Sequence, residues 1–320
     1  MGEFDLIKRY FKRDIALGAT VDLGIGDDCA LLSPSPGVQT LISCDMLVEG
    51  RHFLSTVQPD RLGHKALAVN LSDLAACGAT PRVFTLALAL PKVDEGFLEG
   101  FSRGLFALAD AHGITLIGGD TTAGPLNICI TVIGEAPTGS ALLRSGARAG
   151  DDLYVSGRLG DARLALEVFR GKLNLLGEQF EQVRLAMECP QPRVALGQAL
   201  RGVASSAIDL SDGLIGDLGH LLQASKVGAS LALEALPHSA ALAGQPLAIQ
   251  RECMLAGGDD YELLFSAPTA ARTAVRNAAI ASATLVTRIG SIDQAFGLRL
   301  LDGQGQALPL SLAGFDHFKS

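Results

Sequence analysis

Residues 60–78 read DRLGHKALAVNLSDLAACG, and apolar side chains return in this run every three or four positions. That spacing predicts an amphipathic helix over Asp60–Cys77, which Gly78 can end. Four of its apolar residues can face the core: Leu62, Ala66, Val69 and Leu74. Asn70 and Asp73 stand three positions apart, so they share one face of the helix. Polar side chains among apolar neighbours favour a functional site on that face.

The rest of the chain alternates between strand and helix patterns, which is typical of an α/β or α+β protein. The predicted strands are Val21–Asp28, Leu41–Cys44, Val83–Leu90, Ile114–Ile117, Leu126–Gly134, Leu153–Ser156, Ser206–Ile208, Ser230–Leu233 and Glu262–Ser266. The other predicted helices are Phe4–Arg13, Glu95–His112, Asp161–Phe169, Arg193–Arg201 and Ala270–Ala281, and the stretch Asp209-Leu210-Ser211-Asp212-Gly213 opens a further helix that runs to about Ser225. With 320 residues, the chain exceeds the usual size of one core. Because Ala136–Asp152 has the composition of a linker, we expect two domains, 1–137 and 138–320.

Six short stretches place aspartates beside glycine, serine or another small residue. They are Gly26-Asp27-Asp28, Ser43-Cys44-Asp45, Leu71-Ser72-Asp73, Gly118-Gly119-Asp120, Asp209-Leu210-Ser211-Asp212 and Gly257-Gly258-Asp259-Asp260. On such tight loops, backbone N–H groups can also approach an anion. Mg²⁺ prefers oxygen ligands, few of them from the protein, with nucleotide phosphates completing its shell. The pattern therefore predicts Mg²⁺-assisted phosphate chemistry, and the alternative for any single aspartate is a turn or helix cap.

Two of these tripeptides occur twice at equal separation. Leu-Ser-Asp begins at positions 71 and 210, and Gly-Gly-Asp begins at positions 118 and 257. The equal separation indicates either duplicated halves or a coincidence of two common tripeptides.

The composition narrows the class of partner. The formal net charge is −8, tryptophan is absent and aromatic residues make up 5%, which disfavours nucleic acid as a partner. The longest strongly apolar stretch, Val83–Leu90, is too short to cross a bilayer, and the N-terminus has no signal-peptide core. Six cysteines without C-x-x-C or zinc spacing are typical of reduced thiols. We expect a cytoplasmic protein that binds neither nucleic acid nor membrane.

Several familiar nucleotide and hydrolase motifs are missing. The Gly171-Lys172 pair is followed by Leu173, so there is no P-loop, and a dinucleotide fingerprint beginning at Gly24 fails at Cys29. The sequence also lacks H-R-D, H-E-x-x-H and G-x-S-x-G. Phosphoryl transfer at dispersed aspartate loops needs no covalent nucleophile, because positioning and electrostatics supply most of the catalysis. Arg144 could clamp a phosphate, since a guanidinium grips two oxygens, or could be an ordinary linker cation.

Seven stretches, in order over nearly the whole chain, resemble the thiamine-monophosphate kinase family. They are residues 24–32, 49–53, 64–79, 117–122, 144–147, 206–214 and 257–263. The resemblance implies an aminoimidazole ribonucleotide synthetase-like fold, with an N-terminal mixed sheet that binds ATP and forms a homodimer, and a C-terminal αβ domain that completes the active site. It also implies a reaction: ATP and thiamine monophosphate give ADP and thiamine diphosphate by direct transfer of the γ-phosphoryl group, assisted by several Mg²⁺ ions.

The resemblance also implies roles for individual residues. The Mg²⁺ ligands would be Asp28, Ser43, Cys44, Asp45, Asp73, Asp120, Asp209 and Asp212. The ATP contacts would be Gly119, Asp120, Arg144 and Ser211, and the catalytic residues Asp120, Asp212 and Arg144. The substrate side would comprise His52, Asp259 and Phe315, in which Phe315 faces the cationic thiamine and Asp259 compensates its charge. Asp27 and Asp260 are expected to be structural or outer-sphere groups.

Three positions depart from the family pattern. Cys44 stands where Thr or Ser is common, and because a thiol is a poor Mg²⁺ ligand, only its backbone carbonyl could serve. Asp259 replaces a commoner Glu, and Phe315 replaces Tyr or Trp. The alternatives are another ATP-dependent synthetase of the same superfamily and a non-catalytic nucleotide-binding protein.

Overall fold

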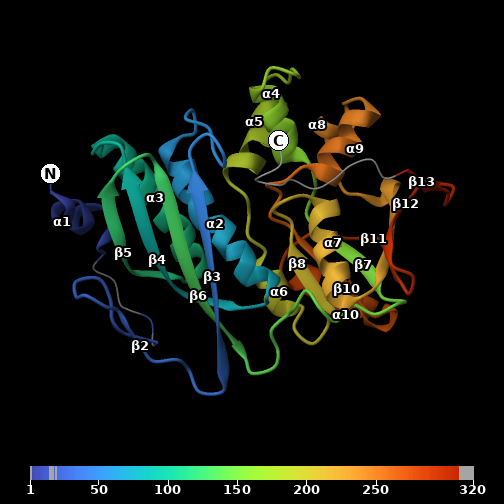
Figure 1. Ribbon diagram of the computed structural model, residues 1–320, viewed down its shortest axis with the longest axis horizontal. Helices are drawn as coiled ribbons and strands as arrows, with labels where there is room; N and C mark the ends of the chain where they lie inside the picture. The colour runs from blue at the N-terminus through green and yellow to red at the C-terminus, as the bar shows by residue number, and fades with distance from the viewer. Residues whose placement is uncertain (1, 14–17, 19, 310–320) are drawn as a thin grey trace. The chain divides into compact units, whose positions relative to one another are not determined.

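The chain folds into two compact units, each with its own sheet (Figure 1). The computed structural model describes residues 2–13, 18 and 20–309, so Phe315 lies outside the described residues. Unit 1 comprises residues 1–74 and 79–139, and unit 2 comprises residues 75–78 and 140–320.

Unit 1 is built on a four-stranded sheet with the strand order β3-β6-β4-β5. Its strands are β3 (Val38–Val48), β4 (Thr80–Leu90), β5 (Thr115–Ala123) and β6 (Asn127–Pro137). Strand β6 pairs antiparallel with both β3 and β4, whereas β5 runs parallel to β4. The parallel pair requires a crossover, which helix α3 (Glu95–His112) supplies. Figure 1 shows the four strands side by side.

The two faces of this sheet differ. Side chains alternate along a strand, and on β3 Leu47 is 4% exposed while Ile42 and Met46 are 65% and 54% exposed. Helix α2 (Pro59–Ala76) lies against the Leu47 side, because Asn70 and Asp73 hydrogen-bond to β3 there. The opposite side, which carries Ile42 and Met46, is called the open face below.

Helices α2 and α3 approach each other at two glycines. A Cβ atom on Gly63 of α2 would overlap main-chain atoms of Phe101, and one on Gly104 of α3 would overlap main-chain atoms of Asp60. The helix backbones can therefore touch only because both positions lack a side chain.

The N-terminal elements of unit 1 are short. They are α1 (Glu3–Leu6), the π-helix η1 (Ile7–Phe11), β1 (Val21–Leu23) and β2 (Leu31–Leu32). The predicted helix Phe4–Arg13 therefore ends early, at Phe11, where Lys12 turns to an extended conformation. The predicted strand Val21–Asp28 ends at Leu23, because the chain enters a loop in which Gly26 has a φ of 136°.

Two aspartates that we expected on loops after strands lie inside strands instead. Asp45 is within β3, which stays paired with β6 from Val38 to Val48. Asp120 is within β5, because a register shift opposite Phe84 and Thr85 absorbs one residue and lets the strand continue past Gly118. Both carboxylates therefore belong to strands and not to loops.

Unit 2 contains a seven-stranded sheet in the order β13-β12-β9-β11-β7-β10-β8, antiparallel except between β9 and β12. The strands are β7 (Asp152–Ser156), β8 (Ser206–Asp209), β9 (Gly228–Ala232), β10 (Leu263–Ala267), β11 (Val286–Asp293), β12 (Gly297–Leu301) and β13 (Ala307–Leu308). The helices are α4 (Asp161–Phe169), α5 (Glu178–Glu188), α6 (Val194–Ala199), α7 (Leu214–Ser225), α8 (Ala240–Ala243), α9 (Leu247–Ala256) and α10 (Arg272–Ala281). Two 3₁₀ turns, η2 (Leu233–Ala235) and η3 (Thr269–Ala271), complete the unit.

Helix α4 has the predicted bounds, whereas α5, α8 and α9 have no counterpart among the predicted helices. Helices α8 and α9 are short and follow Ser239 and Pro246, so their sequence offers little periodic signal. Nowhere in residues 2–13, 18 and 20–309 does a helix have the length and apolar character that crossing a membrane requires.

The repeated tripeptides do not occupy equivalent structures. Asp73 lies inside a helix, whereas Asp212 lies in the bend before α7. Gly118 to Asp120 belong to a strand, whereas Gly257 to Asp259 form a loop before β10. The equal separation is therefore a coincidence of sequence and not a structural repeat.

A buried ion pair in unit 2 links β7 to α10 and β11. Asp152 is 4% exposed and accepts hydrogen bonds from Arg272 Nε at 2.6 Å and from Arg288 Nη1 at 3.0 Å. The hydrogen bond from Arg272 is the largest cause that lowers the pKa of Asp152 to about 2.

Asp152→Asn should reduce the free energy of unfolding at pH 7 by about 1–2 kcal/mol, since it removes the charge that the two arginines bind. A lowered pKa stabilises the fold above the unfolded value, about 4, and this stabilisation is lost as the pH falls toward 2. Urea denaturation at several pH values should show the difference between wild type and variant shrinking below pH 4. A difference independent of pH would contradict the assignment.

Candidate active site

Four polar side chains come together between β3 and α2 in unit 1. Ser43 Oγ donates a hydrogen bond to Asp73 Oδ2, and the main-chain N–H of Asp45 donates to Asn70 Oδ1 at 3.0 Å. Asn70 is held from behind, because its Nδ2 donates to the Ala66 carbonyl at 3.0 Å. Ser43 and Asp45 share one side of β3 by alternation, and Asn70 and Asp73 share one side of α2, as their spacing predicts.

The electrostatics of this group suit a cation. Burial, and secondarily the charge of Asp73, raise the pKa of Asp45 to about 6. Two neighbouring carboxylates oppose each other's ionisation, and a divalent cation that binds both would remove this cost. The donor set consists of hydroxyl, carboxylate and amide oxygens, which Mg²⁺ prefers. These residues therefore fit the predicted metal.

Cys44 does not join this group through its thiol. Its side chain lies on the open face of β3, where its Sγ is 3.4 Å from Cys129 Sγ on β6. Since Ser43 and Asp45 point to the other side of the sheet, the thiol cannot meet a metal bound by them. The expectation that only the Cys44 carbonyl could serve as a ligand stays a prediction.

His52 lies just beyond the end of β3. Its Nδ1 accepts a hydrogen bond from the main-chain N–H of Val48 at 3.0 Å, and its carbonyl accepts one from Lys65 Nζ at 3.1 Å. An accepting Nδ1 places the proton of a neutral imidazole on Nε2. The ring is thus fixed in orientation, and its contact with substrate stays a prediction.

A second acidic region of unit 1 surrounds a cavity of about 660 Å³. Asp28, Gly119 and Asp120 line it, together with Lys8 and Lys12 of the N-terminal segment. The volume is typical of a small-molecule site, and lysines are common phosphate ligands. The two lysines were not predicted: their i, i+4 spacing is visible in the sequence, but their place beside the Gly26-Asp27-Asp28 loop is not.

The two acidic regions of unit 1 involve opposite edge strands of the sheet, β3 for Asp45 and β5 for Asp120. Asp120 is paired with Ala87 on β4, whereas Asp45 is paired through β6 with Leu86. Strands β6 and β4 therefore lie between the two residues. Within the ranges that the structure describes, no three His, Cys, Asp or Glu side chains gather closely enough to hold a metal ion.

In unit 2, the two predicted aspartate loops lie against each other. Asp209 ends β8, and the following residues lead into α7. The main-chain N–H of Asp259 donates to the Ser211 carbonyl at 2.9 Å, and that of Tyr261 donates to the Leu210 carbonyl at 2.8 Å. Ser211, a predicted ATP contact, and Asp259, a predicted substrate contact, are therefore adjacent.

Asp217 was not predicted, yet it shapes the first of these loops. Its Oδ2 accepts hydrogen bonds from the main-chain N–H groups of Asp212 and Gly213 at 3.0 and 3.1 Å. Burial is the largest cause that raises the pKa of Asp217 to about 7. The carboxylate occupies main-chain donors that a helix N-terminus usually offers to an anion. Its signal in the sequence is an acid in the first turn of the helix after Asp212.

Arg144 lies at the other end of α7. Its carbonyl accepts a hydrogen bond from Ser225 Oγ at 3.0 Å, and its side chain is exposed. Helix α7 has 12 residues, which at 1.5 Å per residue is about 18 Å. Unit 2 therefore does not bring the Arg144 main chain near Asp212, and its phosphate-clamp role stays a prediction.

Comparison with known proteins shows which families and solved structures this chain resembles. The family model described as AIR synthase related protein, N-terminal domain, matches residues 26–136. The thiamine-monophosphate kinase of Escherichia coli (strain K12) is 47% identical over 320 residues, which are 99% of this chain and 98% of that protein. The crystal structure of thiamine-monophosphate kinase from Stenotrophomonas maltophilia K279a has a TM-score of 0.85 at 44% identity and covers 95% of this chain and 96% of that chain. AaThiL complexed with AMPPCP and TMP has a TM-score of 0.78 at 28% identity, with 89% of each chain covered.

The fold is AIR synthase-like, and the family model matches its N-terminal part. E. coli HypE, a hydrogenase maturation protein, shares the fold with a TM-score of 0.79 at 22% identity. The identity over the full chain is more specific: the chain belongs to the thiamine-monophosphate kinase family. The predicted fold class, family and kinase class are confirmed.

Proposed function

We propose that the protein transfers the γ-phosphoryl group of ATP directly and in line to thiamine monophosphate, giving thiamine diphosphate and ADP. The observation that carries this proposal is the 47% identity with a thiamine-monophosphate kinase over 99% of the chain. A relative complexed with AMPPCP and TMP supports the pairing of the two substrates.

Mg²⁺ is part of this proposal, and the acid pair of unit 1 gives the strongest support for it. Ser43, Asp45 and Asp73 would hold one ion, which supplies charge neutralisation at phosphate oxygens when bound. The further proposed ligands are Asp28, Asp120, Asp209, Asp212 and the carbonyl of Cys44. The proposed ATP contacts are Gly119, Asp120, Arg144 and Ser211, and the proposed substrate contacts are His52, Asp259 and Phe315.

We also propose a homodimer formed through the open face of unit 1. Ile42 and Met46 are large apolar side chains on the same side of β3, with Cys44 between them, and they are 65% and 54% exposed. Exposed apolar patches of this kind are characteristic of protein interfaces. The same proposal includes two domains: residues 1–137 would bind ATP and Mg²⁺ and form the dimer, and residues 138–320 would complete the active site. It also includes a cytoplasmic location.

The test is formation of thiamine diphosphate by the purified protein with ATP, Mg²⁺ and thiamine monophosphate. We expect one ADP for each thiamine diphosphate, no product with excess EDTA, and recovery when Mg²⁺ is restored. ADP without thiamine diphosphate would favour another ATP-dependent synthetase of the superfamily. Neither product from folded protein would favour a non-catalytic nucleotide-binding protein.

A further inference from the structure

The loop that carries Asp259 has a backbone conformation that residues other than glycine rarely adopt. The φ angle is 68° at Asp259 and 48° at Tyr261. Such conformations cost on the order of 1 kcal/mol each and persist where the surroundings impose them. Tyr261 also donates its hydroxyl to Asp259 Oδ1 at 3.2 Å, so the direction of the carboxylate depends on the same conformation.

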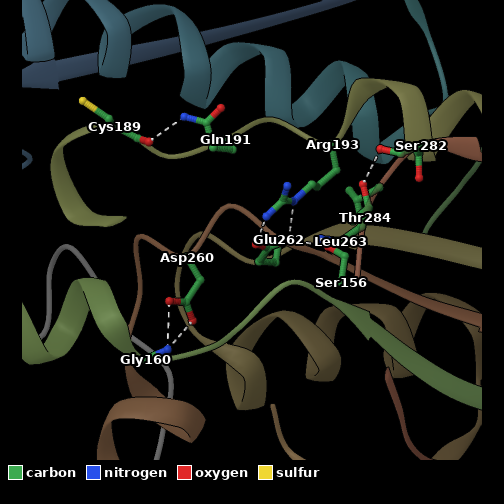
Figure 2. Close-up of polar contacts among 10 residues, drawn as sticks. All are labelled: Ser156, Gly160, Cys189, Gln191, Arg193, Asp260, Glu262, Leu263, Ser282 and Thr284. Carbon is green, nitrogen blue, oxygen red and sulfur yellow. Dashed lines mark hydrogen bonds and ion pairs between the residues drawn. The ribbon is translucent and has the colours of Figure 1, made fainter. Parts of the chain in front are cut away.

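Glu262 anchors the C-terminal end of this loop. Arg193 donates from Nε to Oε2 at 2.7 Å and from Nη2 to Oε1 at 2.5 Å, and Ser156 Oγ donates to Oε2 at 2.5 Å. Figure 2 shows the guanidinium and the hydroxyl converging on this carboxylate. The Glu262 side chain is 8% exposed. It therefore acts inside the protein and does not itself face a substrate.

Ser156, which binds Glu262, also connects β7 to β10. Ser156 Oγ also accepts a hydrogen bond from the main-chain N–H of Leu263 at 2.8 Å, which ties the start of β10 to the end of β7. Gly157, with a φ of 57°, leaves room for the carboxylate, because a Cβ there would overlap it. The site for Glu262 is thus built by the residues around it.

Asp260 anchors the loop at a second point. Both of its carboxylate oxygens accept from the main-chain N–H of Gly160, at 2.9 and 3.1 Å (Figure 2). Gly160 immediately precedes α4, so this contact attaches the loop to the start of that helix. Asp259 therefore stands between two fixed neighbours: Ser211 bonded to its N–H group, and Asp260 bonded to Gly160.

We infer that Glu262, Arg193 and Asp260 are positioning residues that hold the Asp259 carboxylate for the cationic ring of thiamine monophosphate. The inference rests on the proposed function and adds how the Asp259 carboxylate is held in place before thiamine monophosphate binds. A carboxylate fixed before binding loses little conformational entropy when the cation arrives. Loosening the anchors should therefore weaken thiamine monophosphate binding more than ATP binding.

Glu262→Gln tests this inference. The amide keeps the shape of the side chain but places an N–H₂ group against Arg193 or Ser156, both of which donate to this position in the wild type. We expect the KM for thiamine monophosphate to rise by about tenfold or more, with the KM for ATP within about twofold of wild type. Arg193→Lys keeps the charge and loses the two-point contact, so it should give a smaller rise than Arg193→Met.

Asp152→Asn is the matched control, because Asp152 is also a buried acid paired with arginine but stands at the opposite end of β7 from Ser156. It should lower stability and leave both KM values unchanged. Glu262→Gln with lowered stability and an unchanged KM for thiamine monophosphate would overturn the inference alone. If Glu262→Gln does not fold, Arg193→Lys carries the same test. No thiamine diphosphate from the wild type would overturn the proposed function, and the inference with it.

Discussion

Asp73→Asn should lower kcat for thiamine diphosphate formation by at least about a hundredfold, while the protein without Mg²⁺ becomes no less stable than wild type. The loss of rate follows from removing one of two carboxylates that would hold the metal. The retained stability follows from the repulsion between Asp45 and Asp73, which contributes to the raised pKa of Asp45, about 6. A carboxylate that the proposed metal needs would thus lower the stability of the metal-free protein, and the variant should separate the two effects.

The measurements are steady-state kinetics with Mg²⁺ and thermal unfolding with EDTA. Asp110→Asn is a suitable control in the same unit, because Asp110 is 58% exposed and pairs with Arg13 at the surface. We expect its kcat to match wild type. A wild-type kcat for Asp73→Asn, or a melting temperature several degrees lower, would remove Asp73 from the proposed metal site.

Gly119→Ala should destabilise unit 1 by about 3 kcal/mol or more and abolish activity, whereas Gly118→Ala should behave like wild type. Gly119 has a φ of 145°, and a Cβ there would overlap the main chain of Leu86 on the neighbouring strand. A Cβ on Gly118 would have Thr85 Cγ2 as its nearest neighbour, at 4.0 Å. Two adjacent glycines of one motif thus differ sharply in what they tolerate.

Thermal unfolding and thiamine diphosphate formation distinguish this explanation from a direct role in ATP binding. If the close approach of β4 explains Gly119, both readouts should fail together in the Gly119→Ala variant. A variant with the melting temperature of wild type and a raised KM for ATP alone would show that Gly119 matters through the nucleotide and not through the strand.

Helices with strong local signals were predicted well from the sequence. The expected Asp60–Cys77 lies within one residue at each end of the observed α2, and α4 has the expected bounds. Apolar spacing and nearby glycines fix such boundaries, and both are local properties. Strand ends depend on partners far along the chain, so the sequence did not show that Asp45 and Asp120 lie inside strands.

The candidate site likewise combines features that follow from local sequence with features that depend on distant partners. The placing of Asn70 and Asp73 on one face followed from helical spacing and is confirmed by their contacts with β3. That two strands lie between Asp120 and Asp45 depends on strand order and pairing, which no local pattern reveals. The roles of individual site residues came from the family resemblance, and for Phe315 they concern a position outside the described residues.

The close contact of α2 with α3 at Gly63 makes the position of Asp73 depend on the packing of the two helices. Asp73 lies ten residues beyond Gly63, or about 15 Å along the helix axis. With Gly63 as a pivot, a tilt of roughly 4° would displace Asp73 by about 1 Å, which is enough to separate it from Ser43. A small tilt of α2 about Gly63 would thus be amplified along the helix toward Asp73. A methyl group on Gly63 would therefore disturb the proposed metal site without changing any of its proposed ligands.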